Sequence, residues 1–293
     1  MQIAVAGNRT RSAKARFHAA LQEWVTAYDH PLVRYGLGIF LVLLLFSMLG
    51  GFVYTKSPLA IQENLLYSPP SWAAPLGTDN LGRDLLARMI HGGQSTLIAA
   101  LLGSFVALFI GLVYGMSAAL GPKWLDKALM RLLDALLAVP TLVLMIFFAS
   151  IVRLDTLGLI IMLGLVSWPG LARIIRNEAL AYRERDYVLA ARQFGASTFY
   201  IARTHLLRAM LPILIVNATF LVADIVLALA GLTFLGLGIQ PPYASWGGLL
   251  NDGSQMVILG CWWLILFPGL AIFAVILAMN MLGQGLLARL EGR

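Results

Sequence analysis

The chain has 293 residues, of which 60% are hydrophobic and only 12% charged, with a formal net charge of +7 and a mean hydropathy of +0.83. Soluble globular proteins carry about 25% charged residues, so this composition excludes a water-soluble fold and indicates that a lipid bilayer is the solvent. The single cysteine, Cys261, excludes an internal disulfide framework and a cysteine-rich zinc cluster.

The N-terminal stretch, residues 1–33, carries several charges and no long apolar run, which is atypical of a cleavable signal peptide. Its larger apolar side chains recur at helical spacing: Phe17, Leu21, Trp24, Val25 and Tyr28. This pattern predicts a cytoplasmic N-terminal segment with an amphipathic helix on the inner membrane surface, and a plain soluble tail is the alternative.

Six largely apolar stretches follow, and a helical crossing of the bilayer needs about 20 such residues. The first covers residues 34–56, between the flanking charges of Arg34 and Lys56. The other five lie in the ranges 89–122, 134–153, 155–173, 209–232 and 253–288. The sequence therefore predicts an all-α membrane protein with six transmembrane helices. We expect residues 57–91 to form an external loop, residues 92–287 to form a core with five of the helices, and residues 288–293 to form a C-terminal tail.

Lysine and arginine are distributed unequally between the predicted loops, and this distribution sets the orientation of a membrane protein. If the N-terminus is cytoplasmic, few of these cations fall outside: Lys56, Arg83, Arg88 and Arg153. The N-terminus, the C-terminus and segment 176–208 are then all predicted to be cytoplasmic. This orientation accounts for the net positive charge without a nucleic-acid partner.

Segment 176–208 interrupts the apolar sequence with a basic helical hairpin. Residues 178–193 are predicted to be helical, Gly195 ends that helix, and Ser197 is a suitable N-cap for the next one. The small pair Ala190 and Ala191 leaves a smooth surface on which another protein could dock. Anionic lipid headgroups are the alternative partner, because each arginine near the membrane contributes about 1 kcal/mol to such binding. The residues by themselves do not decide between these two partners.

The same segment is similar to the cytoplasmic loop of ABC importer permeases, whose motif is Glu-Ala-Ala, three residues, Gly, nine residues and Ile-x-Leu-Pro. Leu189-Ala190-Ala191 takes the place of Glu-Ala-Ala, and Gly195 takes the place of the glycine. Further stretches resemble the dipeptide, oligopeptide and nickel branch of that family: LGTDNLGRDLLARMIHG (76–92), MRLLDALLAVP (130–140), GLTFLGLGIQPPYASWGGLLNDG (231–253), and FPGLAI with NMLGQGL (267–286). They occur in the family's order along the chain.

This resemblance implies a type I ABC importer permease fold, with a cytoplasmic coupling helix between the fourth and fifth transmembrane helices. The implied partners are a second homologous permease, two ABC ATPase subunits, an extracytoplasmic solute-binding protein and the lipids of a bacterial inner membrane. ATP and magnesium would bind the ATPases, because no lysine of this chain occurs in a GK[ST] motif. The chain itself is expected to be a non-catalytic subunit without a metal site. Peptides are the expected substrates, and nickel or a metal chelate is the alternative.

The resemblance also implies which residues contact the ATPase. These are the hairpin residues Arg185, Asp186, Ala190, Ala191, Arg192, Gln193 and Gly195, whereas Arg176 and Glu178 would orient the hairpin at the membrane surface.

Polar residues elsewhere supply the other candidates. Asp224 is the one ionisable residue within the fifth span, and it is expected to line the translocation pathway or, alternatively, to bind a neighbouring helix. In the external loop, the candidates for contact with the binding protein are Asp79, Arg83 and Asp84, and a self-contained structural cluster is the alternative. Arg131 and Asp134 are expected to form a local ion pair. Gly111 and Gly115 are expected to form a helix-packing face.

Two other functional classes are less consistent with the sequence. An intramembrane enzyme would need HExxH, GxSxG or paired aspartates within the membrane, and none of these occurs. A secondary transporter would usually have inverted repeats or several charges buried in the membrane, and neither is evident. It would also have no use for a docking hairpin.

Overall fold

The computed structural model describes residues 30–152 and 155–291. The amphipathic helix expected within residues 1–33 therefore lies outside the described residues, except for the last few positions of that range. The elements are α2 (Pro31–Val53), η1 (Glu63–Leu65), α3 (Leu85–Leu120), α4 (Lys123–Leu137), α5 (Thr141–Ile151), α6 (Thr156–Arg183), α7 (Asp186–Gln193), α8 (Thr198–Ile201), the π-helical turn η2 (Ala202–Leu206), α9 (Leu207–Phe234), α10 (Trp246–Ser254), η3 (Val257–Leu259) and α11 (Trp263–Glu291).

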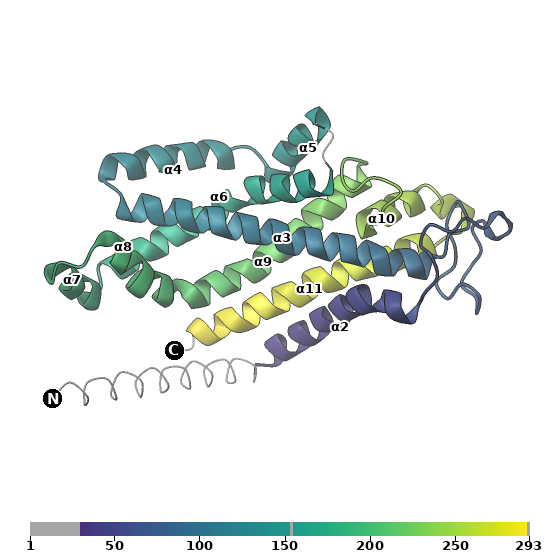
Figure 1. Cartoon of the computed structure of the whole chain (residues 1–293), viewed down its shortest axis with the longest axis horizontal. Coiled ribbons are helices and arrows are strands. Elements are labelled where there is room, and N and C mark those ends of the chain that lie inside the picture. The colour runs from purple at the N-terminus through teal and green to yellow at the C-terminus, as the bar shows by residue number, and fades with distance from the viewer. Residues whose placement is uncertain (1–29, 153–154, 292–293) are drawn as a thin grey trace.

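Long apolar helices form an elongated bundle (Figure 1). Among the described residues, five helical segments are long and apolar enough to cross a membrane: α2, α3, α6, the continuous stretch from α8 to α9, and α11. The pair α4 and α5 makes a sixth span if its two parts are counted together. Their apolar side chains cover much of the outer surface, as expected of a bundle in lipid.

The third span, expected over residues 134–153, is not one continuous helix. The structure divides this region into α4 and α5, whose axes meet at 79° with Pro140 between them. A proline disfavours helical backbone at the preceding residue, so α4 ends before it and α5 begins after it. α5 has 11 residues and rises about 16 Å, roughly half the thickness of a hydrocarbon core. The third span expected from the sequence is therefore present as two helices that meet at an angle.

The most extensive helix pairing in the bundle is that of α3 with α6. It depends on glycines that let the two backbones approach closely, as in other membrane helix pairs. A Cβ atom at Gly115 would lie 2.6 Å from the carbonyl oxygen of Ala172, and one at Gly111 would lie 3.3 Å from that of Trp168. The packing role predicted for Gly111 and Gly115 is confirmed.

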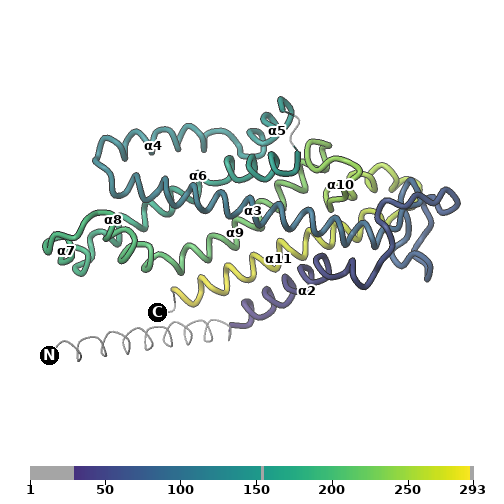
Figure 2. Tube along the Cα trace, in the orientation of Figure 1, coloured from purple at the N-terminus to yellow at the C-terminus, as the bar shows by residue number. Residues whose placement is uncertain are grey.

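The bundle presents different structures at its two ends (Figure 2). At one end, which we call the hairpin end, α7 and α8 project beyond the other helices, and α11 finishes on the same side. At the opposite end, the loop end, residues 54–84 fold over the bundle beside α10. A chain that crosses a membrane would therefore place the hairpin and the end of α11 on one side, and the long loop on the other.

Candidate functional site

The hairpin end is built from two short helices joined by a tight turn. α6 ends at Arg183 and α7 begins at Asp186, so the continuous helix expected over residues 178–193 is broken at Glu184 and Arg185. Gly195 then adopts a φ of +80°, a left-handed conformation that glycine takes without a steric cost. Ser197 caps α8 by accepting a hydrogen bond from the Tyr200 amide, at 3.2 Å. The glycine break and the serine cap are both confirmed.

The residues expected to contact an ATPase lie together on this hairpin. All of them are exposed except Ala191, which is half-buried: Arg185, Asp186, Ala190, Arg192, Gln193 and Gly195. A Cβ atom at Gly195 would meet no atom within 4 Å, so the surface beside it is open. Two exposed apolar side chains on the same hairpin were not among the residues predicted from the sequence. Phe194 is 91% exposed and Phe199 is 74% exposed. Large aromatic residues in an otherwise polar segment were the signal that could have identified them.

The hairpin is fixed to the bundle by a few contacts at its base. Val188 is the fully buried residue of α7. His205, in the π-helical turn, lies between Tyr187 and Tyr200, with ring centroids 5.9 and 5.8 Å away. Arg183 donates a 2.8 Å hydrogen bond to the carbonyl oxygen of Ala119, at the end of α3. These contacts join α7, α8 and the start of α9 into one unit, so that a displacement of the hairpin would move α9.

Two ion pairs connect α4 to α6 near the hairpin. Arg176 donates two hydrogen bonds of 2.5 Å to the two oxygens of Asp126. Arg173 also pairs with a carboxylate of α4, that of Asp134, but through a single nitrogen. The local Arg131–Asp134 pair expected from the sequence is therefore wrong, because Asp134 binds an arginine on another helix. The spacing of residues along α4 could not predict these pairs, since the residues that pair are distant in sequence.

Asp224 lies on α9 and faces a cavity of about 810 Å³. The walls of this cavity come from α4, α5, α6 and α9, and most of the side chains that line it are apolar. Among the described residues, Asp224 has neither a hydrogen-bond partner nor an ion-pair partner, although it is flanked by the buried residues Ala223 and Ile225. Its carboxylate is therefore directed away from the core that these two neighbours form.

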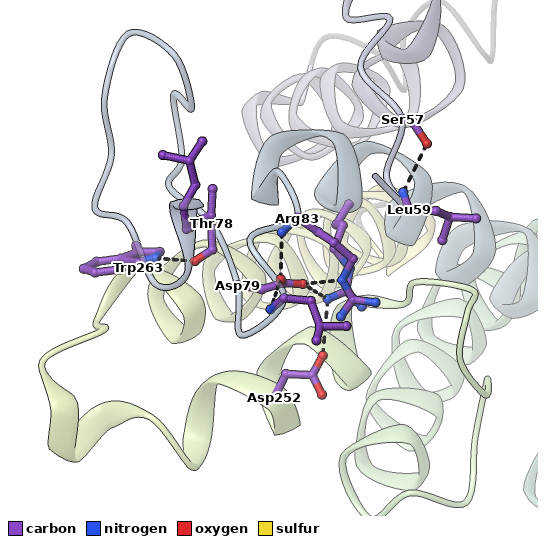
Figure 3. A network of polar contacts seen from close by, with 10 residues as sticks. Ser57, Leu59, Thr78, Asp79, Arg83, Asp252 and Trp263 are labelled. Carbon is purple, nitrogen blue, oxygen red and sulfur yellow. Dashed lines mark hydrogen bonds and ion pairs between the residues drawn. The ribbon is translucent and has the colours of Figure 1, made fainter. Parts of the chain in front are cut away.

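At the loop end, Asp79 is the centre of a buried polar network (Figure 3). Its side chain is 1% exposed and accepts hydrogen bonds from the amides of Leu81 and Arg83, both at 2.9 Å. It also pairs with the side chains of Arg83, at 2.7 Å, and Arg88. Arg88 reaches Asp252 on α10, at 3.4 Å. The network thus joins the loop of residues 54–84, α3 and α10.

Asp84 begins α3 and holds the other side of the loop. One of its oxygens accepts a hydrogen bond from the Ala87 amide, at 3.1 Å, and caps the helix. The other oxygen accepts hydrogen bonds from the Tyr54 hydroxyl, at 2.6 Å, and from Lys56, at 3.1 Å. Both carboxylates, Asp79 and Asp84, are enclosed by these partners rather than presented to solvent. This arrangement is that of a self-contained structural cluster, the alternative to direct contact with a binding protein.

The contacts of Asp84 change the ionisation of its two partners. Burial raises the pKa of the Tyr54 hydroxyl, and the hydrogen bond to Asp84 adds to this rise. Burial by itself lowers the pKa of Lys56, but the hydrogen bonds and charges of Asp84 and Tyr54 together outweigh this effect, so that the pKa of Lys56 is raised. Lys56 therefore keeps its charge at neutral pH, and Asp84 keeps a cationic partner.

Glycines shape the backbone around the network. Gly77 and Gly82 have φ values of +83° and +71°. A Cβ atom at Gly82 would lie 1.9 Å from the carbonyl oxygen of Gln62, which leaves no room for any other residue. Trp263 on α11 donates a 3.2 Å hydrogen bond to the carbonyl oxygen of Thr78 and secures the turn from the other side. The glycines thus allow the conformation of the turn, and the contacts with α10 and α11 hold the turn in that conformation.

Comparison with known proteins identifies the family. Residues 107–293 match the model described as "Binding-protein-dependent transport system inner membrane component". A Brucella suis protein named as a peptide permease is 40% identical over 220 residues, which cover 75% of this chain and 73% of that protein. The "Dipeptide transport system permease protein DppC" of Bacillus subtilis is 35% identical over 266 residues, which cover 90% of this chain and 82% of that protein.

A solved structure supports the same assignment at the level of the fold. The methionine ABC transporter MetNI, in inward-facing conformations, has a chain that matches with a TM-score of 0.53 and 19% sequence identity. The match covers 68% of this chain and 96% of the MetNI chain. The family match and the relatives together show that this chain belongs to the binding-protein-dependent inner-membrane components, as an ABC importer permease of the peptide transport family.

Proposed function

We propose that this chain forms the translocation pathway of an importer for dipeptides and oligopeptides, together with a second homologous permease. Two separate ABC ATPases bind ATP and magnesium, and an extracytoplasmic binding protein delivers the substrate. The observation that carries this proposal is the combination of the exposed hairpin with peptide permeases as relatives. Nickel and metal chelates are the second candidate, since the Brucella suis and Bacillus subtilis relatives are named for peptides.

In this proposal the hairpin transmits force from the ATPase to the bundle. The close-approach surface is Ala190, Ala191 and Gly195, and the flanking polar residues are Arg185, Asp186, Arg192 and Gln193. The contacts at the base of the hairpin connect this surface to α9 through His205. Closure of the ATPase dimer would move the hairpin, and α9 would then alter the walls of the cavity that contains Asp224. Binding of ATP and of the loaded binding protein must favour the same state of the pathway.

The binding protein would contact the loop end in this scheme. Asp79, Arg83 and Asp84 would support that contact by holding the loop in shape, because the two carboxylates are enclosed. The exposed residues of the same loop, such as Trp72, would form the contact itself. This division of roles follows from burial, since an enclosed carboxylate is not available to a partner.

Uptake by the assembled importer tests the proposed function. The complex containing this chain, its permease partner, its ATPases and its binding protein would be reconstituted into liposomes, and accumulation of labelled dialanine measured. We expect accumulation that needs both ATP and the binding protein. Accumulation of nickel without dialanine would favour the second candidate. Full uptake by the isolated chain without ATPases would contradict the proposal and favour a secondary transporter.

A further inference from the structure

The cavity beside Asp224 contains more polar groups than its apolar lining suggests. Ser167 on α6 and Thr141 on α5 also line it, and the remaining side chains of its wall are apolar. Within the described residues, neither the Asp224 carboxylate nor the Ser167 hydroxyl has a hydrogen-bond partner. A carboxylate that faces an apolar wall is costly unless a cation or water compensates it. Among residues 30–152 and 155–291, the carboxylate and this hydroxyl of the cavity thus have no partner.

A backbone carbonyl adds a further acceptor to the same cavity. Pro169 lies inside α6 and has no amide hydrogen, so the carbonyl of Leu165, four residues earlier, lacks its usual helical donor. Both Leu165 and Pro169 line the cavity, and Leu165 is 53% exposed. The space beside Gly170 is open, since a Cβ atom there would meet nothing within 4 Å.

The cavity thus combines a carboxylate, a carbonyl without its helical donor, and the hydroxyls of Ser167 and Thr141, which alone among these groups can also donate a hydrogen bond. Such a set is complementary to a cationic group with several N–H donors. We propose that this cavity binds a primary ammonium group of the transported solute, with Asp224 as its ionic partner and the Leu165 carbonyl as a supporting acceptor. The cavity of this subunit would then bind solutes with a free primary amine more tightly than solutes in which that amine is acylated.

This inference rests on the proposed function, because it places the cavity on the translocation pathway. The size of the cavity is consistent with it: about 810 Å³ lies within the range of ligand pockets of about 300–1,000 Å³. The main alternative for Asp224 is an ion pair with a cation of the second permease subunit. In that case the carboxylate would hold the complex together and would have no effect on which solute binds.

A cysteine in the cavity wall allows solute binding to be measured without the selectivity of the binding protein. Leu227 lines the cavity and is 58% exposed, and the chain's own Cys261 is buried and can be replaced by alanine. In the purified assembled importer, the variant Leu227→Cys with Cys261→Ala would be labelled by a maleimide. The probes are dialanine amide and N-acetyl-dialanine amide, which differ only in the ammonium group.

We expect dialanine amide to slow the labelling at concentrations about tenfold lower than N-acetyl-dialanine amide does. Asp224→Asn should abolish this difference, and Asp224→Glu, which keeps the charge, should retain it. Equal protection by the two probes, or a difference that survives Asp224→Asn, would overturn the inference. A loss of assembled complex in Asp224→Asn would also overturn it, since the carboxylate would then have a structural role. ATP-dependent uptake of dialanine by the unmodified importer is the separate measurement that tests the proposed function itself.

Discussion

Arg176 on α6 holds both carboxylate oxygens of Asp126 on α4, with two hydrogen bonds of 2.5 Å. The two side chains are each 22% exposed, so the pair is partly shielded from water. Paired hydrogen bonds between an arginine and a carboxylate are stronger and more directional than a single contact. The pair therefore fixes α4 against α6, close to the hairpin.

A charge exchange tests this pair. Arg176→Asp and Asp126→Arg should each lower the stability of the purified chain, and the double variant should recover about 0.5–1 kcal/mol, because the pair is restored in reverse. The midpoint of thermal unfolding in detergent is the measurement. The Arg173–Asp134 pair is the matched control, since its side chains are 44% and 63% exposed and its exchange should have little effect. Equal recovery at both pairs would contradict the role given to Arg176.

Asp79 provides a second test, at the loop end. Asp79→Ala would leave Arg88, whose side chain is 6% exposed, without its main partner. Removing one member of a buried pair typically costs about 3–5 kcal/mol. We expect a large loss of folded, membrane-inserted protein, measured by size-exclusion chromatography after extraction.

Glu63, an exposed residue of the same loop without an ion pair among the described residues, is the control for Asp79. Glu63→Ala should leave the yield of folded protein unchanged. A stable Asp79→Ala protein that fails only to respond to its binding protein would show that Asp79 acts as a direct contact instead.

The pairing of α3 with α6 can be tested at one glycine. Gly115→Val would press against the Ala172 carbonyl and the Ile175 side chain, and overpacking of this kind costs about 1–3 kcal/mol. Gly38→Val is the matched control, because a Cβ atom at Gly38 on α2 meets nothing within 4 Å. The free energies of unfolding of the two variants, obtained from thermal unfolding, should differ by about 1–3 kcal/mol. Equal unfolding midpoints would show that the close approach of the two helices has been misplaced.

Gly195 tests the coupling role of the hairpin. Its φ of +80° disfavours a β-branched residue by about 1–2 kcal/mol, whereas asparagine adopts this conformation more readily. We expect Gly195→Val to reduce dialanine uptake more than ATP hydrolysis in the assembled importer. Gly195→Asn should retain more of both activities. If both variants transport normally, neither the conformation nor the smooth surface at Gly195 is needed for coupling.

The sequence predicted features that depend on local chemistry. Gly195 and Ser197 ended one helix and started the next, as their conformational preferences require. Gly111 and Gly115 were recognised because small residues one turn apart line one helix face. The long uncharged stretches located the helices that cross the bilayer, because charge is excluded from its core.

Other features depend on residues that are distant in sequence, and these were not predicted. Asp134 pairs with Arg173 rather than with its neighbour Arg131, because the arrangement of α4 against α6 decides which cation is near. Asp79 and Asp252 are joined through Arg88 only once the loop has folded onto α10. The bend at Pro140 is local, but its 79° angle depends on how α5 packs against the bundle.

The account depends most on the hairpin facing the cytoplasm, where ATPases are found. Phe194→Cys at the hairpin end and Trp72→Cys at the loop end, both at highly exposed positions, would each be placed in a Cys261→Ala background. A maleimide that cannot cross membranes would be applied to intact spheroplasts and to inside-out vesicles. We predict that Phe194→Cys is labelled only in the vesicles and Trp72→Cys only in the spheroplasts. Labelling of Phe194→Cys in intact spheroplasts would contradict the account.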